Sequence, residues 1–353
     1  MPRQTLRIID ANCNRIGEGL RFLEDIARFL LSDAGLSHQL KAMRHRLVKS
    51  LGELGTAMLS ERNSGADVGF GTQLGQHRDL SSLVTANAKR VEEALRVIEE
   101  LAKLPDLSAK LHSKDFEQAR FNLYTLEREL VSRLMRRQKI EQLIGLYVII
   151  DTQMLGLKGE VDAARKAISG GAEIIQLRDK HHSKGELLAI AQKLKDLCRK
   201  SNILFIVNDC LDIALACEAD GVHIGQDDLP LSVVRKELPI DKIVGLSTTT
   251  LAQAQKAEAE GADYIAVASI FSSPTKASAT VVGLERLRQI KQTISIPVVA
   301  IGGINRENVA QVMAAGADAA AVISAVLNQR NIETATRQLV KEIEKETKTH
   351  KES

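Results

Sequence analysis

The sequence contains no tryptophan, and aromatic residues make up only 3% of its 353 residues. This scarcity argues against aromatic platforms on which nucleic-acid bases stack. Neither sign of charge dominates, because 48 basic residues are balanced by 45 acidic ones and the net charge is only +3. We therefore expect neither a nucleic acid nor a membrane surface as a partner.

Long apolar runs and cysteine pairs are also missing. No run of about 18 apolar residues occurs, so we expect no membrane span, and the N-terminal segment has scattered charges instead of an apolar signal core. None of the cysteines forms a CxxC pair, which predicts buried free thiols and a cytoplasmic protein. The cysteines are Cys13, Cys198, Cys210 and Cys217.

The first part of the chain, residues 1–138, has helical periodicity and an internal repeat. The segment "ANCNRIGEGLRFLEDIARFL" (11–30) matches "ANAKRVEEALRVIEELAKL" (86–104) at an offset of 75 residues. Apolar residues in both copies recur every three or four positions, which predicts one buried helical face in each. We expect these two helices to pair in a bundle that helices near 35–54 and 114–137 complete. The repeated charges predict either a solvated, salt-bridged face or a shared polar site.

From residue 144 the pattern changes to short apolar runs that alternate with helical stretches. The eight runs are 146–151, 173–178, 203–209, 221–225, 242–247, 263–269, 296–303 and 318–324. Nearly continuous apolar runs are typical of parallel strands covered by helices. Eight such units in about 200 residues predict an α/β fold, a closed (β/α)8 TIM barrel, with an open doubly wound sheet as the alternative.

The two patterns predict the domain organisation, and short motifs predict helix boundaries. We expect a helical domain (1–138), a linker (139–143), the barrel (144–345) and a charged tail (346–353). Ser183 with Glu186 and Thr250 with Gln253 fit the capping box that begins a helix. Glycines at 171, 261 and 316 each precede a strand and are expected to end the helix before it.

Polar residues follow the predicted strands, at the end where barrel enzymes carry their working residues. Together with glycines and one isoleucine at the last two strand ends, they are Gln176, Arg178, Lys180, Asn208, Asp209, His223, Asp227, Asp228, Ser247, Ser273, Thr275, Lys276, Gly302, Gly303, Ile323 and Ser324. The cations among them suit a multiply charged phosphate, and Asp209 with Asp228 suits Mg²⁺. We expect Asp227 to cap the next helix instead, and His181–His182 to lie in a solvated loop.

The last two strand ends predict a second anion site. Backbone amides around Gly303 and Ser324 follow the seventh and eighth strands, where barrels commonly bind a phosphate. A diphosphate held by cations and Mg²⁺ would then face a separate monophosphate pocket. This arrangement favours a reaction that releases pyrophosphate over isomerisation of a monophosphate.

Five motifs together resemble thiamine-phosphate synthases. They are "QLRDK" (176–180), "NDCLDIALACEADGVHIGQDDLP" (208–230), "GLSTTT" (245–250), "SPTK" (273–276) and "AIGGI" (300–304), in the family's order and spacing over residues 144–335. The resemblance implies a transferase that joins 4-amino-2-methyl-5-hydroxymethylpyrimidine diphosphate to a thiazole phosphate, giving thiamine monophosphate and pyrophosphate. Two alternatives stay open for the barrel: a thiazole tautomerase-like enzyme and a non-catalytic phosphate-binding regulator.

The resemblance also implies roles for individual residues. Gln176 and Asn208 would contact the pyrimidine, while Mg²⁺ would bind Asp209 and Asp228. The catalytic residues that hold the diphosphate would be Arg178, Lys180, Ser247 and Lys276, and the thiazole phosphate would bind at Ser273, Thr275, Gly303, Ile323 and Ser324. The family's usual turn is Thr-Pro-Thr-Lys, and Ser273 departs from it but keeps the hydroxyl group. The family mechanism is dissociative and requires no general base.

The helical region resembles the small domain that is fused to such synthases and described as an unusual hydroxymethylpyrimidine-phosphate kinase. The resemblance rests on the internal repeat and on "RNSGADVG" (62–69), within a Gly-rich polar segment at 60–79. No GxxxxGK[ST] phosphate loop occurs, so the residues alone identify no nucleotide site. A dimerisation or docking bundle is the alternative, and a homo-oligomer stays open.

Overall fold

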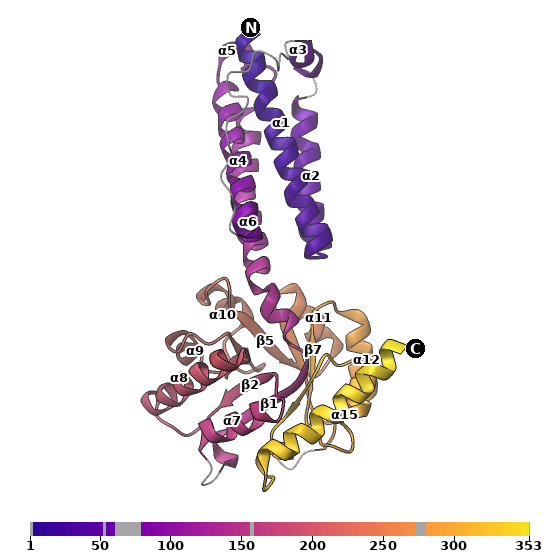
Figure 1. The fold of residues 1–353 in the computed structure, drawn as a ribbon. Helices are drawn as coiled ribbons and strands as arrows, with labels where there is room; N and C mark the ends of the chain where they lie inside the picture. Colours follow the sequence, from indigo (N-terminus) through magenta and orange to yellow (C-terminus); the bar gives the residue numbers. More distant parts are fainter. Residues whose placement is uncertain (1–2, 52–53, 61–78, 156–158, 273–279, 353) are drawn as a thin grey trace. The chain divides into compact units, whose positions relative to one another are not determined.

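The computed structural model describes residues 3–51, 54–60, 79–155, 159–272 and 280–352, with the backbone alone for 348–352 (Figure 1). The chain divides into two compact units, Met1–Met135 and Arg136–Ser353. Each unit is described by itself below. No helix within these ranges is long and apolar enough to cross a membrane.

The first unit is a helical bundle. Its helices are α1 (Arg3–Asp25), a π-helical turn (Ile26–Leu30), α2 (Ala34–Leu51), α3 (Gly55–Ser60), α4 (Leu80–Leu101), α5 (Pro105–Ser108) and α6 (Ser113–Glu141), whose residues from Arg136 onward belong to the second unit. The four expected helices are confirmed as α1, α2, α4 and α6. The short helices α3 and α5 were not predicted, because neither is long enough to show a periodic pattern.

The two repeats pack directly against each other as α1 and α4. The apolar faces expected from the repeat are buried, with Ile16 and Leu20 on α1 and Val91 and Leu95 on α4 at most 2% exposed. Gly19 allows the close approach, because a Cβ atom there would lie 2.3 Å from Val91 Cγ2. The duplicated sequence therefore builds a duplicated interface at the centre of the bundle.

The repeated charges fall into two groups. Arg15, Glu18 and Arg21 are exposed, as a solvated face requires. Glu24 and its repeat partner Glu99 are instead buried, with side chains 6% and 4% exposed, and each carboxylate binds an arginine of the following long helix. The solvated-face interpretation is therefore wrong for these two positions, because a buried carboxylate needs a partner of opposite charge.

The second unit is a closed parallel barrel, which confirms the expected fold. Its strands are β1 (Gly145–Asp151), β2 (Ile174–Arg178), β3 (Leu204–Asn208), β4 (Gly221–Ile224), β5 (Ile243–Thr248), β6 (Tyr264–Val267), β7 (Val298–Ile301) and β8 (Ala319–Val322). Each strand pairs in parallel with the next, and β8 pairs with β1. The open-sheet alternative is therefore wrong. All strand ends of one polarity lie at the same rim.

Helices surround the barrel (Figure 1). They are α7 (Glu160–Ser169), α8 (Lys184–Ser201), α9 (Leu211–Ala216), α10 (Leu231–Glu237), α11 (Leu251–Ala259), α12 (Gly283–Thr293), α13 (Val309–Ala314), α14 (Ser324–Leu327) and α15 (Ile332–Glu352), with a 3₁₀ turn at Thr152–Met154. Both predicted capping boxes are present, at the start of α8 and of α11. The glycines expected to end helices have φ between 90° and 100° at 171, 261 and 316, a backbone conformation that favours glycine. The N-cap of α10 is Pro230, so the capping role expected for Asp227 is wrong.

Alternate residues of each strand fill the barrel interior, as the two-residue period of a strand requires. This inner cluster is formed by Leu143, Tyr147, Ile149, Ile174, Leu204, Ile206, Ile243, Tyr264, Ala266, Val299, Ala319 and Ala321. The remaining strand residues pack against the helices in a larger cluster. Two tyrosines thus stand inside an otherwise aliphatic core, and their hydroxyl groups need hydrogen-bond partners there.

The end of α6 is bound to the amino ends of the strands. Arg136 Nε donates to Asp263 Oδ1 at 2.7 Å, and the Asp263 side chain is only 4% exposed. Lys139 Nζ lies 3.0 Å from Asp241 Oδ2. Residues 139–141, which the sequence assigns to a linker, are thus helical and tied to the barrel. The residues predicted to form the site belong to the carboxyl ends of the strands.

Candidate active site

The carboxyl ends of the strands bring the predicted residues that the structure describes to one end of the barrel. Gln176 and Arg178 lie on β2, Asn208 ends β3, and Ser247 lies near the end of β5. His223 lies on β4. The predicted residues Ser273, Thr275 and Lys276 lie outside the described residues.

Two carboxylates form an acidic pair just beyond β3 and β4. Burial and the neighbouring Asp228 raise the pKa of Asp209 to about 6, although the charges of Lys180 and Arg178 oppose this rise. Asp209 has φ of 60°, and its backbone N–H donates to His223 O at 2.8 Å. Asp228 accepts a hydrogen bond from Gly225 N at 2.7 Å. The carboxylates of Asp209 and Asp228 therefore repel each other, and Asp209 has a backbone conformation that residues with side chains rarely adopt. Both features are typical of a site that binds a cation.

A buried carboxylate that sequence reasoning missed holds the arginine of the site. Asp151, at the end of β1, forms an ion pair with Arg178, and the Asp151 side chain is only 2% exposed. Asp151 also accepts from Gln153 N at 3.1 Å. The ion pair fixes one end of the guanidinium group and leaves its other donors for a ligand. Its sequence signal was weak, since an Asp that ends a strand is usually a turn or cap residue.

The loop after β2 is organised by Asp179. Thr152 donates a hydrogen bond to Asp179, and the backbone N–H groups of His181 and His182 do so at 3.0 and 2.9 Å. Burial alone would raise the pKa of Asp179, but these bonds and the His182 side chain lower it to about 2. The two histidines are exposed, as expected of a solvated loop. No group of three or more metal-ligating side chains occurs in the described part of the chain.

The tyrosine hydroxyl groups inside the barrel connect two of the predicted substrate-binding residues. Gln176 Nε2 donates to Tyr147 Oη at 2.8 Å, and Tyr147 Oη lies 3.3 Å from Tyr264 Oη. Tyr264 Oη lies 3.1 Å from His223 Nδ1, and His223 Nε2 lies 2.9 Å from Ser247 Oγ. Burial lowers the pKa of His223 to about 4. We call these five side chains the interior polar chain.

Glycines shape the rim beyond β7. Gly302 and Gly303 have φ of 105° and 64°. A Cβ atom on Gly303 would lie 2.4 Å from Ser272 O, so only glycine fits this turn. Asn308 Nδ2 binds Gly303 O at 3.0 Å and holds the turn in place. Ile323 and Ser324 lie at the start of α14, directly after β8.

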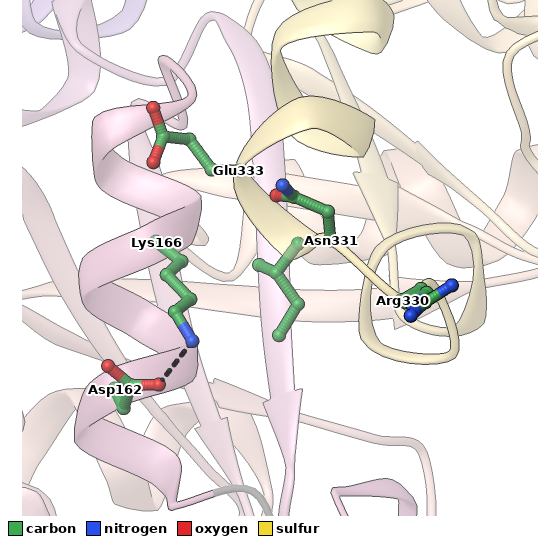
Figure 2. A pocket seen from close by; sticks show the side chains of 6 residues that line it. Asp162, Lys166, Arg330, Asn331 and Glu333 are labelled. Carbon is green, nitrogen blue, oxygen red and sulfur yellow. Dashed lines mark ion pairs between the residues drawn. The ribbon is translucent and has the colours of Figure 1, made fainter.

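A separate cleft of about 240 Å³ lies between α7 and the start of α15 (Figure 2). Its lining residues are Asp162, Lys166, Arg330, Asn331, Ile332 and Glu333. Lys166 forms an ion pair with Asp162 at 2.7 Å, and Asn331 Oδ1 accepts from Thr334 N at the start of α15. None of these residues belongs to the predicted site.

The barrel and its rim of cations, carboxylates and glycine turns define a phosphate-handling α/β-barrel enzyme. The family model "Thiamine monophosphate synthase" matches residues 146–326, and the model "ThiD2 family" matches residues 7–129. This chain belongs to the thiamine-phosphate synthase family and is a transferase.

Similar proteins extend the match over both units. A "Thiamine-phosphate synthase" of Synechocystis sp. is 40% identical over 348 residues, covering 97% of this chain and 97% of that protein. A "Thiamine-phosphate synthase" of Thermosynechococcus vestitus is 38% identical, and the match covers 96% of this chain and 94% of that protein. The solved "Thiamine phosphate pyrophosphorylase" of Pyrococcus furiosus is 41% identical, with a TM-score of 0.55, and covers 59% of this chain and 98% of that one.

Proposed function

We propose that the barrel joins the hydroxymethylpyrimidine diphosphate to the thiazole phosphate, forming thiamine monophosphate and releasing pyrophosphate. One observation carries this proposal: the acidic pair Asp209/Asp228 lies near the cations Arg178 and Lys180, which oppose the rise of the Asp209 pKa. Anion-binding and cation-binding groups thus meet at one rim. A diphosphate with a divalent cation satisfies both.

The residues at the rim would divide between the two parts of the first substrate. Gln176 and Asn208 would bind the pyrimidine through their amide groups, which both donate and accept hydrogen bonds. Arg178, Lys180 and Ser247 would bind the diphosphate, with the guanidinium group positioned by Asp151. Lys276 would join them by the family resemblance, although it lies outside the described residues.

The acidic pair fits Mg²⁺, which proteins commonly hold through one or two carboxylates while substrate phosphates and water complete its shell. Asp209 and Asp228 would supply those carboxylates, and their mutual repulsion would be relieved. When bound, the ion neutralises charge on the leaving pyrophosphate.

The chain's own residues would stabilise departure of the pyrophosphate. As the bond from carbon to oxygen breaks, negative charge grows on the leaving group next to Arg178 and Lys180. Preorganised charges of this kind lower the barrier without moving during the reaction. The thiazole nitrogen would then capture the pyrimidine-stabilised cation. No described residue is required as a general base, and burial lowers the pKa of His223 to about 4, which makes it a weak base.

The thiazole phosphate would bind on the far side of the rim, at Gly303, Ile323 and Ser324. The glycine turn keeps side chains away from this point, so a phosphate can approach the backbone. Ser273 and Thr275, outside the described residues, would contribute their hydroxyl groups. This placement would bring the two reactants together at one rim.

For the helical unit we propose a pyrimidine-phosphate kinase, which would supply the diphosphate that the barrel consumes. The match of residues 7–129 to the "ThiD2 family" supports this assignment. The alternative is a dimerisation bundle. The full chain should form ADP from ATP in the presence of the pyrimidine monophosphate. Absence of ADP, together with a concentration-dependent dimer in sedimentation, would favour the alternative.

The synthase assignment is tested with the full chain, both substrates and Mg²⁺. We expect pyrophosphate and thiamine monophosphate to form in equal amounts. The two products are measured by ³¹P NMR and chromatography. Conversion of the thiazole compound alone, without Mg²⁺, would identify a tautomerase-like enzyme. Binding of both substrates without product would identify a phosphate-binding regulator.

A further inference from the structure

The interior polar chain runs across the barrel core from Gln176 on β2 to Ser247 on β5. Four of its members are almost completely buried, with Tyr264 at 0%, Tyr147 at 2%, Gln176 at 3% and His223 at 7% exposed. Its hydrogen bonds are 2.8, 3.3, 3.1 and 2.9 Å long from Gln176 to Ser247. Four polar side chains in the core of a barrel are costly unless their hydrogen bonds are satisfied.

The packing around Tyr264 holds this chain in one arrangement. Gly245 on β5 makes room for the ring, because a Cβ atom there would lie 2.0 Å from Tyr264 Cζ. The His223 ring stacks on Tyr264, with centroids 5.5 Å apart and planes at 29°. The two rings therefore have little freedom to change hydrogen-bond partners.

Starting from the donor Gln176 Nε2, only one direction of hydrogen bonding gives every proton along the chain an acceptor. Gln176 Nε2 can only donate, so Tyr147 Oη accepts there and is free to donate its own proton to Tyr264 Oη. Tyr264 then donates to His223 Nδ1, which accepts only when it carries no proton. A neutral imidazole of this tautomer carries its proton on Nε2 and donates it to Ser247 Oγ.

This direction determines what the two ends offer to a ligand. Ser247 Oγ accepts a hydrogen bond from His223 Nε2, so its own O–H points away from the chain and can donate to an anion. Gln176 donates one N–H group to Tyr147, so its side-chain carbonyl oxygen stays available to accept a hydrogen bond from an amino group of a ligand. A reversed chain would place the lone pairs of Ser247 toward the diphosphate and the N–H groups of Gln176 toward the amino group.

We propose that Tyr147, Tyr264 and His223 are positioning residues that orient Gln176 as an acceptor and Ser247 as a donor. The inference rests on the proposed function, because it deepens the roles of Gln176 and Ser247 at the pyrimidine and the diphosphate. A single buried chain thereby prepares both ends of one substrate site before the substrate binds.

The tautomer of His223 in the full chain directly tests the proposed direction of the hydrogen bonds. In ¹⁵N-labelled protein, His223→Gln identifies the His223 signals by their loss. We expect Nε2 to carry the proton and Nδ1 to carry none near neutral pH. A proton on Nδ1, or on both nitrogens, would overturn the proposal. This measurement needs no substrate, so it stands even if the protein fails to make thiamine monophosphate.

Three tyrosine variants sharpen the test. Tyr264→Phe removes the donor to His223 Nδ1, so we expect a mixture of tautomers and a roughly tenfold higher KM for the pyrimidine diphosphate, with KM for the thiazole phosphate unchanged. Tyr147→Phe leaves that donor in place and should keep the Nε2–H tautomer. Tyr124→Phe, on α6 in the helical unit, is the matched control and should change neither quantity.

The outcomes separate a positioning role from a structural one. If Tyr264→Phe lowers the melting temperature but leaves the tautomer and both KM values unchanged, the proposal is wrong. If Tyr264→Phe does not fold, the tautomer of the wild-type chain still decides. A wild-type chain with the expected tautomer but no pyrophosphate release would contradict the proposed function and leave the hydrogen-bond direction intact.

Discussion

Carboxylates that lie close to other charged groups occur in both units, and their partners differ. In the helical unit, Arg44 Nη2 lies 2.8 Å from Glu24 and Arg120 Nη2 lies 3.0 Å from Glu99. In the barrel, Asp209 lies beside Asp228, and its pKa is raised to about 6. Glu24 and Glu99 are neutralised within the fold, whereas Asp209 and Asp228 at the barrel rim repel each other.

The difference separates charges that build structure from charges that we propose bind a ligand. An opposite-charge pair satisfies itself, and removing one member leaves a buried, uncompensated charge. A like-charge pair costs stability and persists where a ligand relieves it. Glu92 and Glu127 in the helical unit are intermediate, because Lys89 Nζ lies 2.8 Å from one and 3.7 Å from the other.

The largest expected effect is on catalysis. Asp209→Asn should lower kcat by roughly 10²–10³, because the charge growing on the leaving pyrophosphate loses its divalent counter-ion. The initial rate of pyrophosphate release at saturating substrates measures it. Glu92→Gln is the matched control and should leave this rate within a factor of about two. A similar rate in both variants would show that the like-charge pair is not the metal site.

Loss of the arginine partners of Glu24 and Glu99 should lower the stability of the helical unit. Arg44→Met should lower the free energy of unfolding by about 3 kcal/mol, because Glu24 would stay buried without another cation in the described part of the bundle. Arg120→Met should cost about half as much, since Arg96 Nη1 still lies 2.6 Å from Glu99. Urea denaturation followed by circular dichroism measures both. Equal losses would contradict this difference between the repeats.

The raised pKa of Asp209 makes metal binding depend on pH. Mg²⁺ needs the ionised carboxylate, so its affinity should fall about tenfold between pH 7 and pH 5. Without metal, the raised pKa stabilises the fold fully below the ordinary value of 3.8, and this contribution is lost as the pH rises through about 6. Calorimetric titration at several pH values measures the affinity. A flat profile in this range would argue against Asp209 as a ligand.

The smallest expected effect concerns the opposite-charge pair at the rim itself. Asp151→Asn should raise KM for the pyrimidine diphosphate about fivefold, because Arg178 loses the partner that positions it. Asp162→Asn removes the ion pair with Lys166 on α7 and serves as the control. A lower KM in Asp151→Asn would mean that Asp151 competes with the diphosphate for Arg178.

The sequence predicted the barrel because two separate signals indicate each strand. Each apolar run is continuous, and a turn or cap residue follows it, so all eight strands were located to within a few residues. The repeat likewise located α1 and α4. The burial of Glu24 and Glu99 was missed because their arginine partners lie 20 and 21 residues further along the chain, beyond any local pattern.

The site was predicted only where polar residues interrupt an apolar pattern. Asp209 and Asp228 stand out after their strands, and their proximity follows from closure of the barrel. Tyr147 and Tyr264 were missed because they lie inside apolar runs and resemble ordinary core residues. Their hydroxyl partners come from other strands, so the interior polar chain became visible only when the strands were placed side by side.

The acidic pair is tested most directly by calorimetric titration of pyrophosphate into the full chain. In the presence of Mg²⁺, the wild type should bind pyrophosphate, and the double variant Asp209→Asn/Asp228→Asn should bind it at least roughly tenfold more weakly. The double variant Glu92→Gln/Glu127→Gln should bind like the wild type. Equal affinity in all three proteins, or unchanged affinity after Mg²⁺ is removed, would contradict the assignment of the barrel rim as the magnesium diphosphate site.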